Sequence, residues 1–350
     1  MSISETYMKR CLELAKKGLP SAMPNPSVGA VLVYNDQIIG EGFTSPFGGS
    51  HGEVNCINSV KKKDLISKST LYVSLEPCSH TGKTPPCADL IVSNNIPKVV
   101  IGCVDTFSVV AGKGIERLIE NGIEVEVGVL ETECRELNKR FFTFHEKNRP
   151  YIVLKWAQTN DGFIAPAKES HTKDRWISGS QTNQFTHGMR AKELAILVGK
   201  KTVLMDNPSL TTRHFPGENP VRIVIDKNLE SWNSNGPFSI YEKDADTLVI
   251  NNLLNFKKNN VEGIKLNYSI PILPQLMNVL VEKNIQSLIV EGGTQTLQSF
   301  MDTGLWDEAI VISSLKEFGE GVKAPKFNVP EFNSFQIEKD EIRIYKNPDS

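Results

Sequence analysis

Short apolar runs alternate with amphipathic stretches along the whole chain. In the first part of the chain, the runs with the apolar and β-branched content of strands cover residues 30–34, 37–40, 70–75, 99–104 and 124–129. Asn35 and Asp36 separate the first two runs and predict a hairpin. The stretches with helical character cover residues 1–17, 53–62, 88–93, 114–120 and 131–147. The alternation predicts α/β layers with a partly parallel sheet.

The pattern restarts after a proline in the middle of the chain. The charged helical stretch 131–147 ends at Asn148-Arg149-Pro150, and a proline disfavours continuation of a helix. We therefore predict two domains, residues 1–147 and 148–350. In the second domain the predicted strands cover residues 151–156, 195–199, 222–226, 247–250 and 287–291, and the polar stretch 228–260 is expected to form loops around one strand.

Composition narrows the functional classes. A length of 350 residues agrees with two domains, and the hydrophobic content of 39% is that of a globular protein. The net charge of −2 argues against a broad nucleic-acid or membrane surface. No apolar stretch approaches the ~18 residues that span a bilayer, and the first helix lacks the apolar core of a signal peptide. Six cysteines spread over this length do not resemble a disulfide framework, so we expect a cytoplasmic protein.

Three segments of the first domain contain a candidate zinc site. His51 and Glu53 lie where a loop turns into a helix, Cys78 follows a predicted strand, and Cys87 opens the next helix. One imidazole and two thiolates are a regular zinc ligand set that leaves the fourth position for water. Cys78 and Cys87 are both expected near helix starts, where the helix dipole favours the thiolate. Glu53 would remain unligated and would move protons to and from the water.

The cysteine spacing leaves alternatives open. The usual zinc-deaminase signature is His-x-Glu with Pro-Cys-x-x-Cys, whereas here eight residues separate Cys78 from Cys87. Both cysteines could instead be small core residues and His51 a surface histidine. A closed structural zinc site with His80 as the fourth ligand is a further alternative. The histidine segment and the cysteine segment both lie at junctions of loops with strands or helices, and this context favours a catalytic site over these alternatives.

The cysteine segment resembles a known family. The run 76–87, together with Pro24-Asn25-Pro26-Ser27-Val28-Gly29 and the glycine-rich residues 110–114, is similar to the riboflavin-biosynthesis pyrimidine deaminase, in which an eight-residue insert is the rule. The chain departs from that family at Gly52, Thr44 and Thr106, where the family usually has Ala, His and Pro. The resemblance implies a cytidine-deaminase-like three-layer domain. It also implies substrate contacts from Asn25, His80, Lys83, Thr84 and Asp105, among which a lysine and a threonine suit a phosphate.

In the second domain, no Gly-x-Gly-x-x-Gly follows a strand, which argues against an ordinary dinucleotide fold. The run 289–294 instead leads from a predicted strand through Gly292 and Gly293 into a helix. Such a turn exposes backbone N–H groups that suit a phosphate, although a plain strand-to-helix turn would have the same pattern.

The second half also resembles a family. Trp176-Ile177-Ser178-Gly179, Arg190-Ala191 and the run 202–213 are similar to the reductase half of the fused riboflavin enzyme, which has a dihydrofolate-reductase-like α/β fold and uses NADPH. The resemblance implies cofactor contacts from Trp176, Thr202, Asp206, Gly293, Thr294, Gln295, Thr296, Leu297, Gln298 and Ser299. It implies substrate contacts from Lys155, Arg190, Leu210, Arg213 and Glu291. Lys155 and Asp161 lie where the first reductase strand would meet the active site, and two arginines fit a ribose phosphate.

These observations lead to one interpretation and two rivals. We interpret the chain as a bifunctional enzyme of riboflavin biosynthesis that binds one zinc ion and NADPH. The first domain would deaminate 2,5-diamino-6-ribosylamino-4(3H)-pyrimidinone 5′-phosphate, and the second would reduce the ribosyl side chain. The expected partners are a small phosphorylated pyrimidine and further copies of the chain, without nucleic acid or membrane. One rival is a single-activity zinc deaminase with a degenerate reductase half, and the other is a binding protein with a structural zinc ion.

Overall fold

The computed structural model describes residues 2–79, 85–106, 111–167, 176–234 and 236–349. The chain forms two compact units, Met1–Asn148 and Arg149–Ser350. Each unit has its own apolar core and its own main sheet. No helix among the described residues is long and apolar enough to cross a membrane.

The first unit is built on a five-stranded sheet with the order β2-β1-β3-β4-β5. Its strands are β1 (Gly29–Tyr34), β2 (Gln37–Phe43), β3 (Thr70–Leu75), β4 (Lys98–Cys103) and β5 (Glu124–Val127). The predicted hairpin is confirmed, because β1 and β2 pair antiparallel. β3, β4 and β5 run parallel, so the segments that follow β3 and β4 emerge at the same edge of the sheet.

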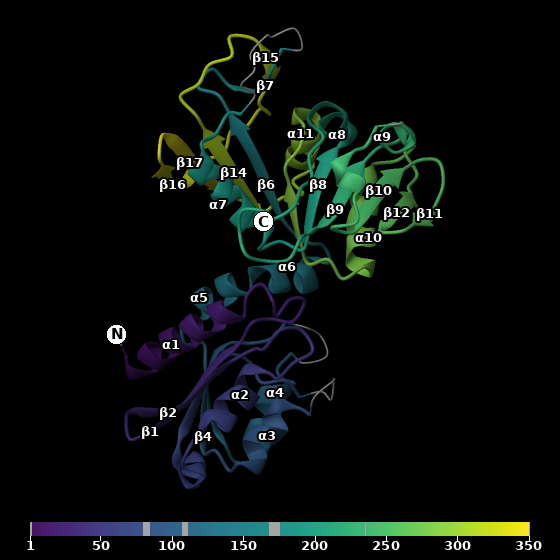
Figure 1. The fold of residues 1–350 in the computed structure, drawn as a ribbon. Helices are drawn as coiled ribbons and strands as arrows, with labels where there is room; N and C mark the ends of the chain where they lie inside the picture. The colour runs from purple at the N-terminus through teal and green to yellow at the C-terminus, as the bar shows by residue number, and fades with distance from the viewer. Residues whose placement is uncertain (1, 80–84, 107–110, 168–175, 235, 350) are drawn as a thin grey trace. The chain divides into compact units, whose positions relative to one another are not determined.

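Helices cover both faces of this sheet (Figure 1). One face carries α1 (Ile3–Gly18) and α5 (Glu131–Leu137), and the other carries α2 (Gly52–Ser59), α3 (Cys87–Ser93) and α4 (Lys113–Glu120). α1 and α2 approach the strands so closely that a Cβ at Gly29 would lie 1.9 Å from the carbonyl oxygen of Cys11, and one at Gly42 would lie 2.2 Å from the amide nitrogen of Cys56. The three-layer arrangement expected from the resemblance is confirmed.

The predicted helix 131–147 is interrupted. α5 ends at Leu137 and α6 (Lys139–Lys147) begins after Asn138. The side chain of Asn138 is buried, accepts a hydrogen bond from the backbone N–H of Ser27 (2.8 Å) and donates one to its carbonyl oxygen (3.0 Å). This long-range pairing explains the break, because an asparagine that binds another segment's backbone is drawn away from regular helix geometry.

The second unit is built on a ten-stranded sheet with the order β11-β12-β10-β9-β8-β13-β6-β14-β17-β16. Its strands are β6 (Tyr151–Gln158), β8 (Ala195–Gly199), β9 (Val221–Ile225), β10 (Thr247–Asn251), β11 (Phe256–Lys258), β12 (Val261–Lys265), β13 (Ser287–Val290), β14 (Glu308–Ser313), β16 (Glu331–Ile337) and β17 (Asp340–Lys346). β8, β13 and β6 are adjacent and parallel. A separate antiparallel pair joins β7 (Phe163–Pro166) to β15 (Gly321–Lys323).

Helices cover both faces of this sheet as well (Figure 1). α10 (Ile272–Glu282) and α11 (Thr294–Asp302) pack with alternate residues of the central strands on one face. α7 (Ser180–Arg190) and α8 (Lys200–Asp206) pack with the remaining alternate residues on the other. Strands buried on both sides are typical of parallel sheets flanked by helices, and the reductase-type α/β fold is confirmed.

The polar stretch 228–260 has more structure than predicted. Besides β10 it contains α9 (Glu230–Asn233), η2 (Ser239–Tyr241) and β11. The fully buried guanidinium of Arg222 organises this region, because it donates hydrogen bonds to several backbone carbonyls and to the Asp244 carboxylate. A polar sequence can therefore be ordered here by a single buried cation.

We expect fragments 1–148 and 149–350 to fold separately. Contacts near the junction stay within one fragment. Asn138 binds Ser27 in the first, and the buried Arg149 binds Asp307 through two hydrogen bonds in the second. Each purified fragment should show one cooperative urea transition with native-like far-UV circular dichroism. If both fragments are recovered only as aggregates, the two domains are not autonomous.

Candidate functional site

His51, Cys78 and Cys87 converge in the first unit. Nδ1 of His51 lies 3.5 Å from Sγ of Cys78 and 3.3 Å from Sγ of Cys87. The three potential ligand atoms all lie within 4.8 Å of one another. Ordinary Zn–S and Zn–N bond lengths place the ligand atoms of a tetrahedral site about 3.6 Å apart. The donor set and its spacing therefore fit a zinc ion with one open position.

The local structure explains how these ligands meet. His51 is the N-cap residue of α2, Cys87 is the first residue of α3, and Cys78 lies in the segment after β3. Cys78 lies outside any helix in the sequence, but its sulfur accepts the backbone N–H of Cys87, the first residue of α3 (3.3 Å), so it lies at the start of that helix as expected. Hydrogen bonds from Cys87 and His51 lower the pKa of the Cys78 thiol, which favours the thiolate needed by a metal.

Glu53 lies in the first turn of α2 and is only 3% exposed. Its Oε2 atom is buried without a hydrogen-bond partner among the residues that the structure describes. Burial, and to a smaller extent the Cys78 sulfur, raise the pKa of this carboxyl to about 7. A buried carboxyl group with an unused oxygen beside a metal ligand set is suited to proton transfer.

Two residues at which the chain departs from the family pattern contact Val28. A Cβ at Gly52 would lie 2.5 Å from the Val28 carbonyl oxygen. The Thr44 hydroxyl oxygen accepts the backbone N–H of Val28 (2.9 Å). Because the Val28 carbonyl oxygen lies so close, glycine is favoured between His51 and Glu53. Thr44 and Asn138 together hold the backbone of residues 27–28, which follow the predicted substrate residue Asn25.

The structure describes some of the other predicted deaminase residues. Asp105 is buried just beyond β4, on the same edge of the sheet as Cys78. Asn25 precedes β1 and is partly exposed. His80, Lys83 and Thr84 lie outside the described residues, so their predicted roles stay predictions, as does the alternative of a closed site with His80.

In the second unit, Glu291 joins two predicted substrate residues. Its carboxylate accepts two hydrogen bonds from Arg190 (2.8 and 2.7 Å) and lies 3.8 Å from Nζ of Lys155. All three side chains are largely buried. Burial alone would raise the pKa of Glu291, but Arg190 and Lys155 hold it at about 2. Two cations around one carboxylate leave a net positive charge, which suits an anionic substrate.

The turn after β13 brings the predicted cofactor residues together. Gly293 has φ of +66° and caps α11, and a Cβ at Gly292 would lie 2.8 Å from Val198 and 3.0 Å from the Thr202 hydroxyl oxygen. A Cβ at Gly199 would lie 2.7 Å from the Thr296 hydroxyl oxygen. The close backbone approach and the free N–H groups at the start of a nine-residue helix fit a cofactor phosphate.

The structure also describes the other predicted substrate and cofactor residues of the second unit. Leu210 is buried with a positive φ of 55°, and Arg213 donates to the Thr211 hydroxyl oxygen (3.3 Å). Asp206 ends α8, and Trp176 is 66% exposed. Asp161, which is predicted to lie where the first reductase strand meets the active site, accepts the backbone N–H groups of Phe318 and Gly319 with its carboxylate.

Two residues near these sites were not identified from the sequence. The carboxylate of Glu76, directly before Pro77-Cys78, accepts four backbone N–H groups. His187, one helical turn before Arg190, is 1% exposed and stacks edge-to-face on His214. Glu76 opens the run 76–87 that carries the family resemblance and directly follows a predicted strand, and His187 precedes Arg190 by three positions; these are the sequence signals that could have pointed to them.

His187 should make stability depend on pH. Burial lowers its pKa from the ordinary 6.5 to about 4, with help from the charges of Arg190, His214 and Arg213. Because the unfolded chain takes up the proton first, stability should fall as pH decreases from about 6.5 to about 4. Urea unfolding of the second unit at several pH values should show this slope, and His187→Gln should flatten it. An unchanged slope in the variant would assign the dependence to other groups.

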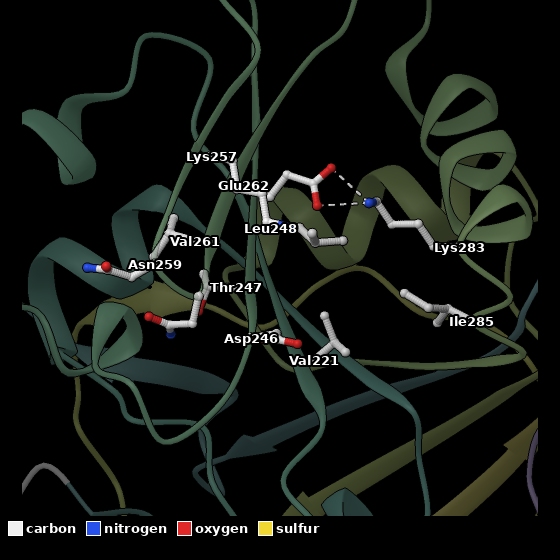
Figure 2. Close-up of a pocket in the computed structure, with 11 residues that line it drawn as sticks. Val221, Asp246, Thr247, Leu248, Lys257, Asn259, Val261, Glu262, Lys283 and Ile285 are labelled. Carbon is white, nitrogen blue, oxygen red and sulfur yellow. Dashed lines mark hydrogen bonds and ion pairs between the residues drawn. The ribbon is translucent and has the colours of Figure 1, made fainter. Parts of the chain in front are cut away.

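A hollow in the second unit lies apart from both groups. It is lined by the amino-terminal ends of β9, β10 and β12, and an ion pair between Lys283 and Glu262 (2.8 Å) crosses its rim (Figure 2). None of the predicted site residues lines it. The predicted residues Lys155 and Glu291 instead lie toward or beyond the carboxyl ends of the parallel strands β6 and β13, where ligands of α/β sheets usually bind.

Family models match most of the chain. Residues 1–103 match the cytidine and deoxycytidylate deaminase zinc-binding region, and residues 150–346 match the RibD C-terminal domain. The chain is 41% identical to the riboflavin biosynthesis protein RibD of Aquifex aeolicus, over 91% of this chain and 89% of the relative. It is 39% identical to RibD of Synechocystis, over 84% of this chain and 79% of the relative.

Solved structures resemble the chain over both units. A diaminohydroxyphosphoribosylaminopyrimidine deaminase/5-amino-6-(5-phosphoribosylamino)uracil reductase from Thermotoga maritima matches with a TM-score of 0.87 and 38% identity, covering 99% of each chain. Acinetobacter baumannii RibD matches with a TM-score of 0.85 and 29% identity, covering 98% of each chain.

Proposed function

The chain belongs to the RibD family of bifunctional riboflavin-biosynthesis deaminase-reductases, and on this premise we propose how its residues divide the work. The protein is an enzyme that performs a deamination and a reduction, with zinc and NADPH as cofactors. The substrate is 2,5-diamino-6-ribosylamino-4(3H)-pyrimidinone 5′-phosphate, and the product is 5-amino-6-ribitylaminouracil 5′-phosphate. The observation that carries the proposal is the presence of a His-Cys-Cys cluster in one unit and a cationic cluster beside a glycine turn in the other.

In the first unit, His51, Cys78 and Cys87 would hold zinc and Glu53 would move protons. Bound zinc makes a water molecule acidic enough to serve as the nucleophile at neutral pH. Glu53 is placed to accept a proton from the nucleophile and to deliver one to the departing amino group, because its free oxygen lies in a buried position beside His51. The release of ammonia then requires no other acid.

In the second unit, Arg190, Lys155 and Glu291 would bind and orient the ribosyl phosphate. NADPH supplies the hydride, so the residues of the chain need only align cofactor and sugar. Thr202 and the turn at Gly293 would bind the cofactor on one side, and the net positive charge around Glu291 would attract the substrate phosphate. Trp176, Asp206, Leu210, Arg213 and the residues that follow Gly293 as far as Ser299 keep the roles that the resemblance implies.

Two further properties are part of the proposal. We propose that the enzyme works in the cytoplasm, which agrees with its six free cysteines. We also propose a homo-oligomer, which light scattering coupled to size-exclusion chromatography would detect as a mass that is a multiple of one chain.

The decisive experiment is an incubation with the diamino-pyrimidine phosphate, with and without NADPH, followed by mass analysis. Without NADPH, we expect only the deaminated product and one equivalent of ammonia. With NADPH, we expect the reduced product as well. Ammonia release without any NADPH-dependent product would favour the single-activity deaminase, and no reaction in either tube would favour a binding protein.

The zinc content should be about one per chain and should depend on Cys87. Cys87→Ser replaces a buried thiolate by a hydroxyl, which is a much poorer zinc ligand, so most of the metal should be lost. Elemental analysis of protein purified without chelator measures this. Cys56→Ser is the matched control, because Cys56 is a buried cysteine of the same unit outside the cluster. Full metal retention in Cys87→Ser would remove Cys87 from the ligand set.

A further inference from the structure

Glu76 connects the metal-ligand segment to the segment that follows β4. The residue is 3% exposed and its backbone N–H extends the β3–β4 ladder by donating to the Cys103 carbonyl oxygen (2.9 Å). Oε1 accepts the N–H groups of Gly114 (2.8 Å) and Ile115 (3.3 Å). Oε2 accepts those of Gly112 (3.0 Å) and Asp105 (3.2 Å). One carboxylate therefore satisfies four backbone donors from a single neighbouring segment.

The segment held by Glu76 lies directly against the metal-ligand segment. A Cβ at Gly114 would lie 2.0 Å from the carbonyl oxygen of Pro77, the residue before Cys78. β3 and β4 are parallel, with Leu75 opposite Cys103, so Asp105 and Cys78 emerge at the same edge of the sheet. Residues 105–106 and 112–115 thus form a wall beside the zinc site, which we call the β4 wall.

The β4 wall carries a polar atom that the fold leaves unused. Oγ1 of Thr106 is buried and has no hydrogen-bond partner within the described part of the chain. Buried polar groups in folded proteins are nearly always paired, so an unpaired one beside a catalytic metal site points to a bound ligand. Asp105, the preceding residue, is also buried.

We propose that Glu76 is a positioning residue of the deaminase, which fixes the β4 wall at the distance from Cys78 at which Asp105 and Thr106 contact the pyrimidine substrate. This inference rests on the proposed deaminase function. Only a carboxylate fits the role, because all four groups that face its two oxygens are donors. A side-chain amide of the same shape would direct its own N–H₂ group at two of them.

The test is Glu76→Gln in the full-length protein, with KM and kcat for ammonia release measured per bound zinc. We expect KM to rise about 10-fold or more, since hydrogen bonds to a charged group are lost and the wall shifts, while kcat per zinc changes less than about 3-fold. Glu76→Asp keeps the charge and should restore part of the affinity. Glu116→Gln makes the same chemical change at an exposed position of α4 and should leave KM unaltered.

A purely structural role would give a different pattern. It would lower the fraction of folded, zinc-loaded protein, and therefore the total rate, without changing KM, and that result would overturn the inference. Should Glu76→Gln not fold, Thr106→Val removes only the unpaired hydroxyl, and its KM should rise several-fold. An unchanged KM in Thr106→Val would overturn the substrate contact of the wall. The proposed function itself fails separately, if the parent protein releases no ammonia.

Discussion

Replacing Glu53 by glutamine should lower the rate of ammonia release by roughly 10²–10⁴-fold, because general acid–base catalysis is lost. Glutamine keeps the size of the side chain but cannot exchange a proton at this pH. The zinc content should be unchanged, since Glu53 is outside the three-residue ligand cluster. Ammonia release and metal content, measured on the same preparation, test both statements.

Reduction provides the internal control for this variant. Glu53→Gln should still oxidise NADPH at the parent rate when it is given the deaminated intermediate. Arg213→Ala should show the converse pattern, with weaker reduction and intact ammonia release. Near-parental ammonia release by Glu53→Gln would exclude the assigned proton transfer, and loss of both activities in both folded variants would exclude two independent sites.

Replacing Glu291 by glutamine should abolish most of the reduction and destabilise the second unit by about 3–5 kcal/mol. The change leaves Arg190 and Lys155 buried without their shared counter-charge. Breaking a buried ion pair on one side costs far more than removing both partners, because the remaining charge stays desolvated. NADPH oxidation and urea unfolding of the variant measure the two effects.

Glu331→Gln is the matched control for Glu291→Gln. Glu331 forms an exposed ion pair with Arg343 (3.7 Å) in the same sheet, and exposed pairs contribute about 0–1 kcal/mol. Its stability and activity should stay close to those of the parent. If Glu291→Gln is no less stable than Glu331→Gln, the Arg190–Glu291–Lys155 cluster is not a buried charge cluster in solution.

The elements with a strong local pattern could be predicted from the sequence. The strand at Thr70–Leu75 and the strand at Ala195–Gly199 begin and end where the apolar runs do. Residues buried in a sheet covered on both faces form continuous apolar runs, so their limits are visible in the sequence. The zinc cluster could be predicted for a similar reason, since each ligand is placed by an adjoining strand or helix end.

Features that depend on distant partners could not be predicted in this way. The break at Asn138 depends on Ser27, and the order of the stretch 228–260 depends on the buried Arg222. Glu76 gives no local signal for its four donors, which come from residues 105–115. Each of these interactions is a hydrogen bond between segments far apart in the chain. The periodicity of hydrophobic residues along the sequence does not reveal such a bond.

The close packing of helices on the first sheet has a practical consequence for thiol chemistry. Cys11, Cys56, Cys103 and Cys134 are fully buried, and three of them occupy the narrow spaces opposite Gly29, Gly42 and Gly102. Of the six cysteines, only Cys78 and Cys87 belong to the metal cluster. An alkylating reagent should therefore find no reactive thiol in the zinc-loaded enzyme, the partly exposed Cys78 alone after mild chelation, since Cys87 is itself fully buried, and all six after denaturation. Counting labelled thiols thus distinguishes an enzyme that has lost its metal from one that has lost its fold.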